Sequence, residues 1–354
     1  MEIQFVAPPT LWGEVSWENY NAGKCGGTES VTLHVARELE KLGHNVRVLT
    51  ELDGKPEVGI GVNLVLPKGA AERTYVDSHQ GWSGIPQYVN GVFLRSYYHQ
   101  TLQRQVNGDL DIDRCFIPGN GIDPTEWWEG SFEKQKDYFI WASTPERGLI
   151  HLLKLWPRIK AAKPEAELHI FYDVFRALDG WRWGVNKMSL DCQQAYLILT
   201  SPEAKKLGIF VHGMVPRAEY LAAMKRAEYM LYTCDPQAPS ELFCMTIAEA
   251  LVARVKVVIP AEVDALESLW KPYCVTIAAP PMTEYPNNAV NNDWVEAAIT
   301  EEDIFPDAEL SRHYVLNTYS WYNVGKRYED VLLGKEMDFG KPKLLLIPGI
   351  IEGS

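Results

Sequence analysis

The sequence predicts an α/β protein made of two halves, each a parallel sheet with helices on both faces. Short apolar runs alternate with segments of helical period along most of the chain, a pattern typical of parallel sheets. The alternation restarts after a polar segment at residues 129–137. The length of 354 residues also favours two domains, at roughly 150 residues per domain.

The first series begins with an expected buried strand at residues 3–7 and a long loop that ends at Gly27. One face of a helix follows, because apolar residues recur at helical spacing at Val31, Val35, Leu39 and Leu42. Gly43 is placed for a left-handed cap, and residues 46–49 form the next expected strand. The first unit is therefore strand, glycine loop, helix, strand.

The second series contains the remaining expected strands, at residues 138–142, 168–172, 209–211, 229–234, 255–259 and 274–277. A helix is expected at about 146–162, and the last strong helical pattern runs over about 321–333. We predict one domain from residues 1–130 plus about 321–354, and a second from 131–320.

Charge and composition exclude several classes of protein. Acidic residues exceed basic ones by 13, with no Lys/Arg-rich run, so no nucleic-acid partner is expected. No apolar stretch reaches the ~18 residues that span a bilayer, and membrane association is not indicated. The six cysteines form no CxxC pair, which favours reduced thiols and a cytoplasmic location.

The segment from Ser240 to Ala250 carries the most chemical information. It is expected to be a loop that leads into a helix, whose unpaired N–H groups from Phe243 to Thr246 suit a phosphate. Glu241 and Glu249 then lie about 12 Å apart along the axis. Carboxylates accept hydrogen bonds from pairs of hydroxyls, so Glu241 suits a transferred sugar and Glu249 a ribose. The alternatives are two solvated helix charges and, for Thr246, a simple helix cap.

This E-x7-E spacing accompanies further motifs over most of the chain. They are Gly26-Gly27-Thr28-Glu29 with the helix ending at Leu42-Gly43-His44-Asn45-Val46, Pro118-Gly119-Asn120-Gly121-Ile122-Asp123, Ser143-Thr144-Pro145-Glu146-Arg147-Gly148-Leu149, and Tyr319-Ser320-Trp321. Together these motifs resemble the retaining nucleotide-sugar glycosyltransferases of the GT-B type, family four. The resemblance implies two facing Rossmann-like domains with a deep interdomain cleft.

The resemblance also implies an activity and a set of site residues. The expected enzyme is a retaining, metal-independent hexosyltransferase that needs no cofactor and uses a nucleoside-diphosphate sugar, GDP-mannose being favoured and a UDP-sugar possible. The acceptor is expected to be a glycan or glycoconjugate, and a homodimer is possible. The implied catalytic residues are Glu241, His79 and Arg147. Residues expected to bind the donor are Gly26, Gly27, Ser143, Phe243, Cys244, Met245, Thr246 and Glu249.

The chain departs from the family pattern at several positions. Cys244 and Arg254 stand where Gly is usual, and Lys256 stands where Pro is usual. Arg147 occupies the position of the family's lysine and keeps its charge. A second basic phosphate ligand has no clear match, and Lys24 or Arg217 are the candidates.

Other motifs in the chain are incomplete, and they give little support to different functions. Asp109, Asp111 and Asp113 resemble a calcium loop, but Arg114 stands where an EF-hand requires Gly, so a solvated loop is expected. The glycine motifs around Gly61, Gly23 and Gly84 are incomplete, which removes support for dehydrogenase, ATPase and serine-hydrolase functions. A GT-B type epimerase and a non-catalytic nucleotide-sugar-binding protein remain as alternatives.

Overall fold

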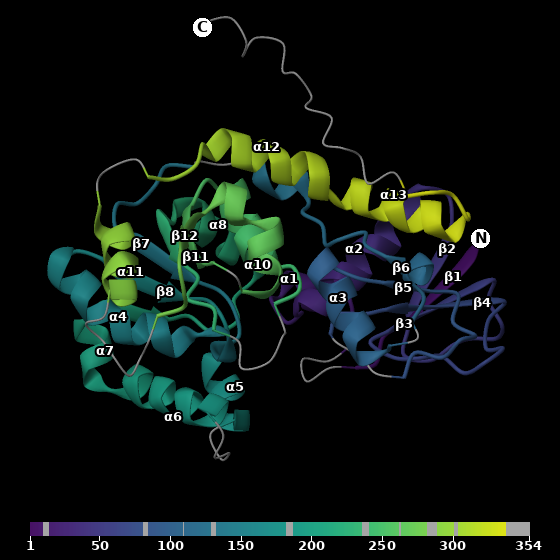
Figure 1. Ribbon diagram of the computed structural model, residues 1–354, viewed down its shortest axis with the longest axis horizontal. Helices are drawn as coiled ribbons and strands as arrows, with labels where there is room; N and C mark the ends of the chain where they lie inside the picture. Colours follow the sequence, from purple (N-terminus) through teal and green to yellow (C-terminus); the bar gives the residue numbers. More distant parts are fainter. Residues whose placement is uncertain are drawn as a thin grey trace, which may run out of the picture.

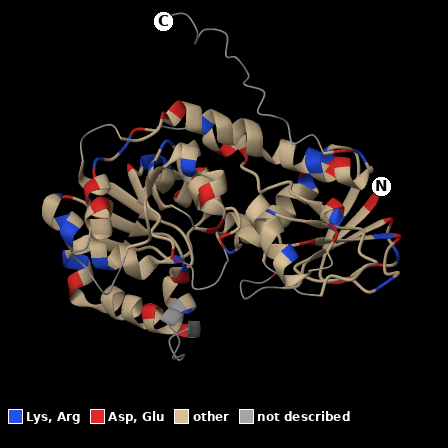
Figure 2. Ribbon diagram, in the orientation of Figure 1, with Lys and Arg blue, Asp and Glu red and all other residues tan. Residues whose placement is uncertain are grey.

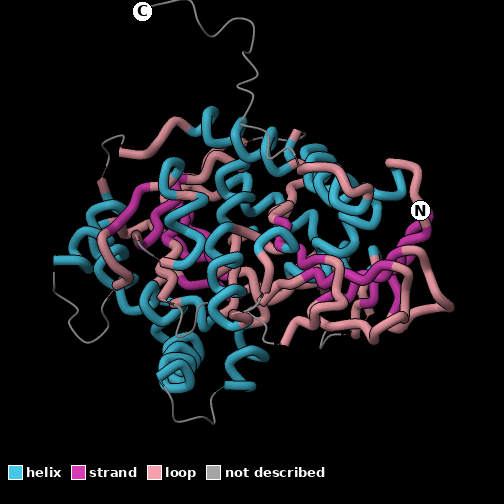
Figure 3. The backbone as a smooth tube through the Cα atoms, turned by 45° about the vertical axis from the view of Figure 1, so that its right-hand side comes forward, coloured by secondary structure: helices cyan, strands magenta, loops and turns pink. Residues whose placement is uncertain are grey.

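The computed structural model places a six-stranded parallel sheet at the centre of each half of the chain (Figure 1). It describes residues 1–9, 14–80, 84–108, 110–128, 132–181, 187–235, 241–261, 263–281, 289–300 and 304–337. In both views helices surround the strands of the second half, whereas strands of the first half reach the edge of the molecule (Figures 1 and 3).

The first sheet has the strand order β2-β1-β3-β4-β5-β6. Its strands are β1 (Glu2–Val6), β2 (Asn45–Leu49), β3 (Val58–Val62), β4 (Arg73–Asp77), β5 (Gly91–Phe93) and β6 (Cys115–Phe116). The two strands expected in this region are present, whereas β3 to β6 were not predicted. Glycine dilutes the apolar signal of β3, and it is required there, because a Cβ at Gly61 would lie 2.3 Å from the Leu64 carbonyl oxygen.

The second sheet has the order β12-β11-β10-β7-β8-β9, which is the usual order of a doubly wound fold. Its strands are β7 (Tyr138–Trp141), β8 (Glu167–Ile170), β9 (Ile209–Val211), β10 (Tyr229–Leu231), β11 (Lys256–Pro260) and β12 (Val275–Ile277). Every strand expected here is present. β10 ends earlier than expected, at Leu231, and Thr233 beyond it donates a hydrogen bond to the Gly148 carbonyl at 2.8 Å.

The helices cover both faces of the sheets. In the first half they are α1 (Trp17–Asn21), α2 (Gly27–Lys41) and α3 (Tyr97–Val106). The second half has α4 (Leu149–Ala162), α5 (Val174–Trp181), α6 (Lys187–Thr200), α7 (Pro202–Lys206), α8 (Arg217–Arg226), α9 (Met245–Val252), α10 (Asp264–Leu269) and α11 (Ala289–Ile299). Short 3-10 helices include η1 (Ile112–Arg114), η2 (Pro124–Trp127), η3 (Pro145–Arg147) and η4 (Lys271–Tyr273).

The helix expected from Glu146 onward is interrupted. Gly148 has φ +91° between η3 and α4, and a Cβ there would lie 2.1 Å from the Thr233 carbonyl oxygen. Glycine therefore lets the chain after β7 approach the chain after β10. The expected left-handed cap at Gly43 is confirmed, with φ +92°.

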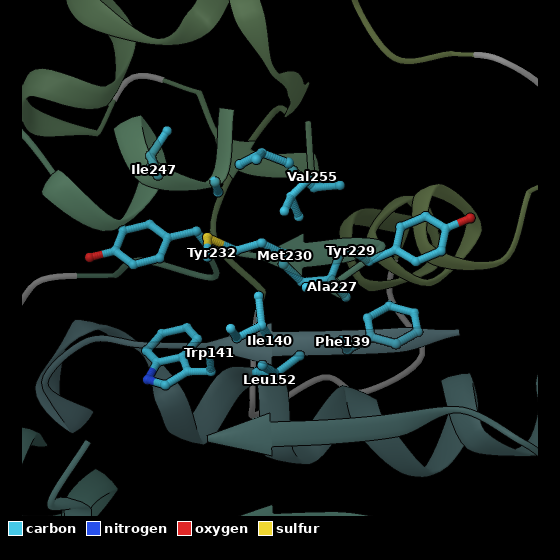
Figure 4. Close-up of a cluster of buried hydrophobic side chains, with 14 of the residues drawn as sticks. Phe139, Ile140, Trp141, Leu152, Ala227, Tyr229, Met230, Tyr232, Ile247 and Val255 are labelled. Carbon is cyan, nitrogen blue, oxygen red and sulfur yellow. The ribbon is translucent and has the colours of Figure 1, made fainter. Parts of the chain in front are cut away.

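The core of the second half contains most of the buried tryptophans. Figure 4 shows Phe139 and Trp141 of β7 beside Tyr229 and Tyr232, with side chains from α4 and α9 on either side. The fully buried tryptophans are Trp127, Trp141, Trp156, Trp270 and Trp294. Most tryptophans in the described part of the chain therefore fill the core.

The last two helices, α12 (Ala308–Tyr319) and α13 (Trp321–Leu332), run along one side of both halves (Figure 1). α13 packs on α2, where the Trp321 ring stacks on His34 at a centroid distance of 4.6 Å. Beside this contact, Ile122 and Ser320 form a parallel bridge. The two crossings of the chain between the sheets are therefore joined to each other. The expected boundary at residues 130 and 131 lies outside the described residues.

Positions of basic and acidic residues are interspersed along the ribbon (Figure 2). None of the described helices is long and apolar enough to cross a membrane. In the acidic loop, Asp111 caps η1 and accepts a hydrogen bond from the Asp113 amide at 3.0 Å, while Asp109 lies outside the described residues.

Candidate functional site

A cleft of about 470 Å³ lies between the two halves. Every site residue expected from the sequence lines it, namely Gly26, Gly27, His79, Ser143, Arg147, Glu241, Phe243, Cys244, Met245, Thr246 and Glu249. The halves also approach closely beside it, because a Cβ at Gly23 would lie 1.8 Å from the Val215 carbonyl oxygen.

The cleft opens at the point where the second sheet reverses its strand order. That reversal falls between β7 and β10, and ligands of doubly wound sheets bind outside the carboxyl ends of such a pair. Ser143 and Arg147 follow β7, and Tyr232 follows β10. The Ser143 Oγ and Tyr232 OH atoms are 3.1 Å apart, so the two loops meet at the base of the cleft.

Glu241 is held by partners from both of these loops. Arg147 Nη1 donates to its Oε2 at 3.0 Å, and Tyr232 OH donates to the same oxygen at 2.6 Å. The Glu241 amide donates to Asp264 Oδ2 at 3.0 Å, which fixes the backbone as well. Burial raises the pKa of Tyr232 well above its usual value, so the phenol stays a hydrogen-bond donor. This carboxylate is positioned rather than solvated.

Glu249 is held by a similar pair of groups. Arg217 Nη2 lies 2.6 Å from its Oε1, and Tyr220 OH donates to its Oε2 at 2.8 Å. Arg217 also binds Glu126 of η2 through two donors, at 2.6 and 3.1 Å. Tyr20 of α1 donates to Glu126 at 3.1 Å. The interpretation of Glu241 and Glu249 as solvated helix charges is therefore wrong.

The candidates for a second basic phosphate ligand differ in their surroundings. The guanidinium of Arg217 is paired with two carboxylates, Glu126 and Glu249, and although burial lowers its pKa, these neighbours raise it well above the usual arginine value. Lys24 is exposed and forms no ion pair among the described contacts. Arg217 therefore binds Glu249 and Glu126. Lys24 as the second basic phosphate ligand stays a prediction.

The two departures from glycine lie at positions with left-handed backbone. Cys244 has φ +66° as the N-cap of α9, and Arg254 has φ +62° just past the end of that helix. The backbone conformation that glycine favours is retained with other residues, at a cost of roughly 1–2 kcal/mol each. Burial and Glu241 raise the pKa of the Cys244 thiol, so it stays protonated.

The residues at the start of α9, from Phe243 to Thr246, line the cleft and are fixed by hydrogen bonds to other elements. Phe243 is fixed by Trp270, whose Nε1 donates to the Phe243 carbonyl at 2.5 Å. The interpretation of Thr246 as a helix cap is wrong, because its hydroxyl donates instead to the Ala142 carbonyl at 2.6 Å. Thr246 therefore ties α9 to the end of β7.

The glycine loop forms the opposite wall. Gly26 is the N-cap of α2 with φ −81°, so the positive φ that glycine permits is used at Gly23 rather than here. A Cβ at Gly27 would meet nothing within 4 Å, so the surrounding atoms do not require glycine at this position.

His79 stands at the end of β4 above a buried ionic cluster. Its Nε2 lies 3.4 Å from Asp77 Oδ2, and Asp77 also pairs with Arg95 and accepts from Tyr328 OH at 2.8 Å. Burial and the neighbouring Arg95 lower the pKa of His79, so the ring is neutral near pH 7. Because Tyr328 belongs to α13, the last helix reaches the base of this site.

Comparison with solved structures places this architecture among glycosyltransferases. A glycosyltransferase involved in avilamycin A biosynthesis superposes with a TM-score of 0.65 at 15% identity, covering 94% of this chain and 98% of its own. Sucrose-phosphate synthase from Thermosynechococcus elongatus gives 0.61 at 10% identity, covering 94% and 98%. The chain has the GT-B fold.

A third GT-B structure, HepE from Anabaena in complex with UDP and glucose, gives a TM-score of 0.58 at 13% identity and covers 94% of this chain and 100% of its own. No protein-family model matches the sequence, and no match was found among curated proteins. At these identities the likeness establishes the GT-B fold alone, so the chemistry must be argued from the cleft.

Several residues of this GT-B cleft were missed by sequence reasoning. Arg95, Tyr20, Tyr220 and Tyr232 line it, and Glu126 and Asp264 hold residues that do. Only Tyr232 carried a usable signal, because it lies near the carboxyl end of an expected strand of a parallel sheet. The others come from separate elements that meet only in the folded chain.

Proposed function

We propose that the protein transfers a hexose from a nucleoside-diphosphate sugar to a glycan or glycoconjugate acceptor, with retention of configuration. The observation that carries this proposal is the convergence of Glu241, Glu249 and Arg147 at the switch point of the second sheet. GDP-mannose remains the donor favoured by the sequence, and UDP-sugars are the alternative.

The two carboxylates would bind different parts of the donor. Glu241 would accept hydrogen bonds from hydroxyls of the transferred sugar, and Glu249 would do so from the ribose. Each carboxylate is already neutralised by an arginine and oriented by a tyrosine, so binding does not require it to be reorganised. Preorganised acceptors of this kind favour a polyhydroxylated ligand.

Arg147 and the start of α9 would stabilise the leaving diphosphate. The guanidinium has five N–H donors, and the described contact with Glu241 uses one nitrogen. The N-terminus of α9, with Met245 and Thr246 on the cleft wall, adds a partial positive charge. Negative charge that develops on the phosphate as the anomeric bond breaks is thereby offset.

Retention is proposed to proceed on one face of the sugar, with the departing phosphate taking the acceptor proton. Glu241 is engaged by Arg147 and Tyr232 through the same oxygen, which suits a positioning role better than nucleophilic attack. The reaction is proposed to need no metal. A sugar trapped covalently on Glu241 would overturn the single-face mechanism.

The function is tested by calorimetric titration with GDP-mannose, UDP-glucose, UDP-N-acetylglucosamine, GDP and UDP, followed by product analysis. We expect one nucleotide series to bind and the matching sugar to be transferred or slowly hydrolysed, with the anomeric configuration retained. Glu241→Ala should abolish transfer and keep nucleotide binding. Failure of every nucleotide to bind, or epimerised donor as the product without acceptor, would contradict the proposal.

A further inference from the structure

Helix α10 lies on the side of the second half that faces the first half, and it packs against α3 (Figure 1). Its first residue, Asp264, accepts a hydrogen bond from the amide of Glu241 at 3.0 Å. The amide of Ala265 donates to the Glu241 carbonyl, also at 3.0 Å. Both backbone polar groups of Glu241 are therefore bound by the start of α10, whereas its carboxylate is bound by Arg147 and Tyr232.

The loop after Glu241 is bound by the other end of the same helix. Trp270, which directly follows α10, donates through Nε1 to the Phe243 carbonyl. Ala265, Leu266 and Trp270 are completely buried, so α10 is anchored in the second half. The loop from Glu241 to Phe243 is consequently positioned by α10 as well as by the sheet.

Asp264 has a backbone conformation that few side chains favour. Its φ is +46°, in the left-handed region, which is unfavourable for residues other than glycine. Asp and Asn are among the residues that tolerate this region best. Glycine would relieve the conformation, but it would also remove the carboxylate that binds the Glu241 amide. Such strain persists where the surrounding structure requires it, and it is often found at functional sites.

Asp264 also interacts with the first half, through Tyr98 of α3. Burial, a hydrogen bond to Asp264 and the charge of that carboxylate together raise the pKa of Tyr98, so the hydroxyl stays protonated and can donate. Among the described residues, neither Tyr98 nor Asp264 belongs to the lining of the main cleft. Both residues can therefore affect the cleft only through the groups that they hold.

We propose that Asp264 is a positioning residue for Glu241, and that Tyr98 holds Asp264 from the first half. This inference rests on the proposed transfer function. The contacts run from Tyr98 through Asp264 to the Glu241 backbone, so the first half helps to place this carboxylate against the transferred sugar. Because small displacements of a group at the reacting centre are costly, loss of either contact lowers the rate of transfer.

Three variants test the effect on the rate, with Tyr322→Phe at an exposed position of α13 as the matched control. Asp264→Gly permits the left-handed backbone but removes the carboxylate, so kcat should fall by about tenfold with the Kd for donor unchanged. Asp264→Asn keeps an acceptor oxygen and should restore kcat to within about threefold of wild type. Tyr98→Phe should lower kcat by about threefold, and Tyr322→Phe should behave as wild type.

Hydrogen exchange without a donor reports on the position of Glu241 separately from the reaction. In Asp264→Gly and Tyr98→Phe the segment 241–246 should exchange faster by about threefold or more, while β7 exchanges as in wild type. The urea midpoint of Asp264→Gly should change little, because relief of the left-handed backbone offsets the lost hydrogen bond. A role in folding alone would lower that midpoint and leave kcat at the wild-type value.

These measurements distinguish failure of this inference from failure of the proposed function. Unchanged exchange of segment 241–246 in both variants would overturn the inference, even if the nucleotide titration succeeds. Faster exchange with a wild-type kcat would overturn the positioning role. A wild-type protein that binds no nucleotide contradicts the transfer function, whereas the exchange data still decide whether Asp264 and Tyr98 hold Glu241.

Discussion

Glu241 and Glu249 are held by the same kinds of group but are connected to different parts of the molecule. Each carboxylate binds one arginine and one tyrosine hydroxyl. The partners of Glu241, Arg147 and Tyr232, both follow strands of the second sheet. Arg217, which binds Glu249, continues to Glu126 in the connection and through it to Tyr20 of α1. The side-chain partners of Glu241 therefore come from one sheet, whereas those of Glu249 lead across to the first half.

This difference indicates separate tasks for the two carboxylates. A group that acts on the reacting sugar gains from a rigid setting within one sheet, because small displacements are costly to catalysis. A group that binds the distant end of the donor can also couple donor binding to the arrangement of the two halves. We therefore expect changes around Glu241 to lower the rate, and changes around Glu249 to alter donor affinity and the arrangement of the halves.

The largest effect is expected from Glu241→Gln. Loss of the carboxylate charge leaves Arg147 without its counterion and removes an acceptor for the sugar, so kcat should fall by about 10²–10³. Initial rates at saturating donor measure this. Glu249→Gln is the matched control and should mainly raise the Kd for donor, by about tenfold. Equal losses of kcat in the two variants would remove the distinction between them.

Arg217→Met should have the next largest effect. It leaves Glu249 and Glu126 as neighbouring uncompensated carboxylates, and we expect the free energy of unfolding to fall by about 2 kcal/mol, less than for a fully buried pair. Urea unfolding measures the loss, and small-angle scattering should show altered packing of the halves. Arg147→Met should lower kcat and leave the scattering unchanged. If only Arg147→Met changed the scattering, then Arg147 rather than Arg217 would be the arginine that fixes the arrangement of the halves.

Smaller effects are expected from the two tyrosines. Tyr232→Phe and Tyr220→Phe each remove one hydrogen bond to a charged group, worth about 1.5 kcal/mol. The first should lower kcat by about tenfold, and the second should raise the Kd for donor by a similar factor. Steady-state kinetics over a range of donor concentrations separates the two. The comparison fails if both variants change the same constant.

The smallest effects concern the ends of α9, the helix that bears Glu249. Arg254→Gly relieves a left-handed backbone but loses the ion pair with Glu309 and the contact with Phe132, so we expect a gain of about 0.5 kcal/mol. Cys244→Gly relieves a similar strain but empties a buried site, and should give no gain. Urea midpoints of the two variants test this. Greater stabilisation by Cys244→Gly would contradict it.

The strands of the second half could be predicted from the sequence more completely than those of the first half. Strands of the second sheet are near-continuous apolar runs, which a periodicity argument detects. In the first half, β3 alternates with glycine and β6 has two residues, so neither has a clear pattern. Helix α4 was expected to start early because the turn at Gly148 reflects a close approach to Thr233, a residue far away in sequence.

The site residues divide in the same manner. Glu241, Glu249 and the residues between them could be predicted because they share one short segment. The partners that fix these carboxylates could not, because Arg217, Tyr220 and Tyr232 come from different elements.

The bridge between Ile122 and Ser320 has a consequence for how the molecule can come apart. The amide of Ile122 donates to the Tyr319 carbonyl at 2.6 Å, and the amide of Trp321 donates to the Ile122 carbonyl at 3.0 Å. Two covalent connections thus pass through one hydrogen-bonded point. A protease that cut either connection would leave a nicked protein still tethered by the other, and the halves could pivot about that point without sliding apart.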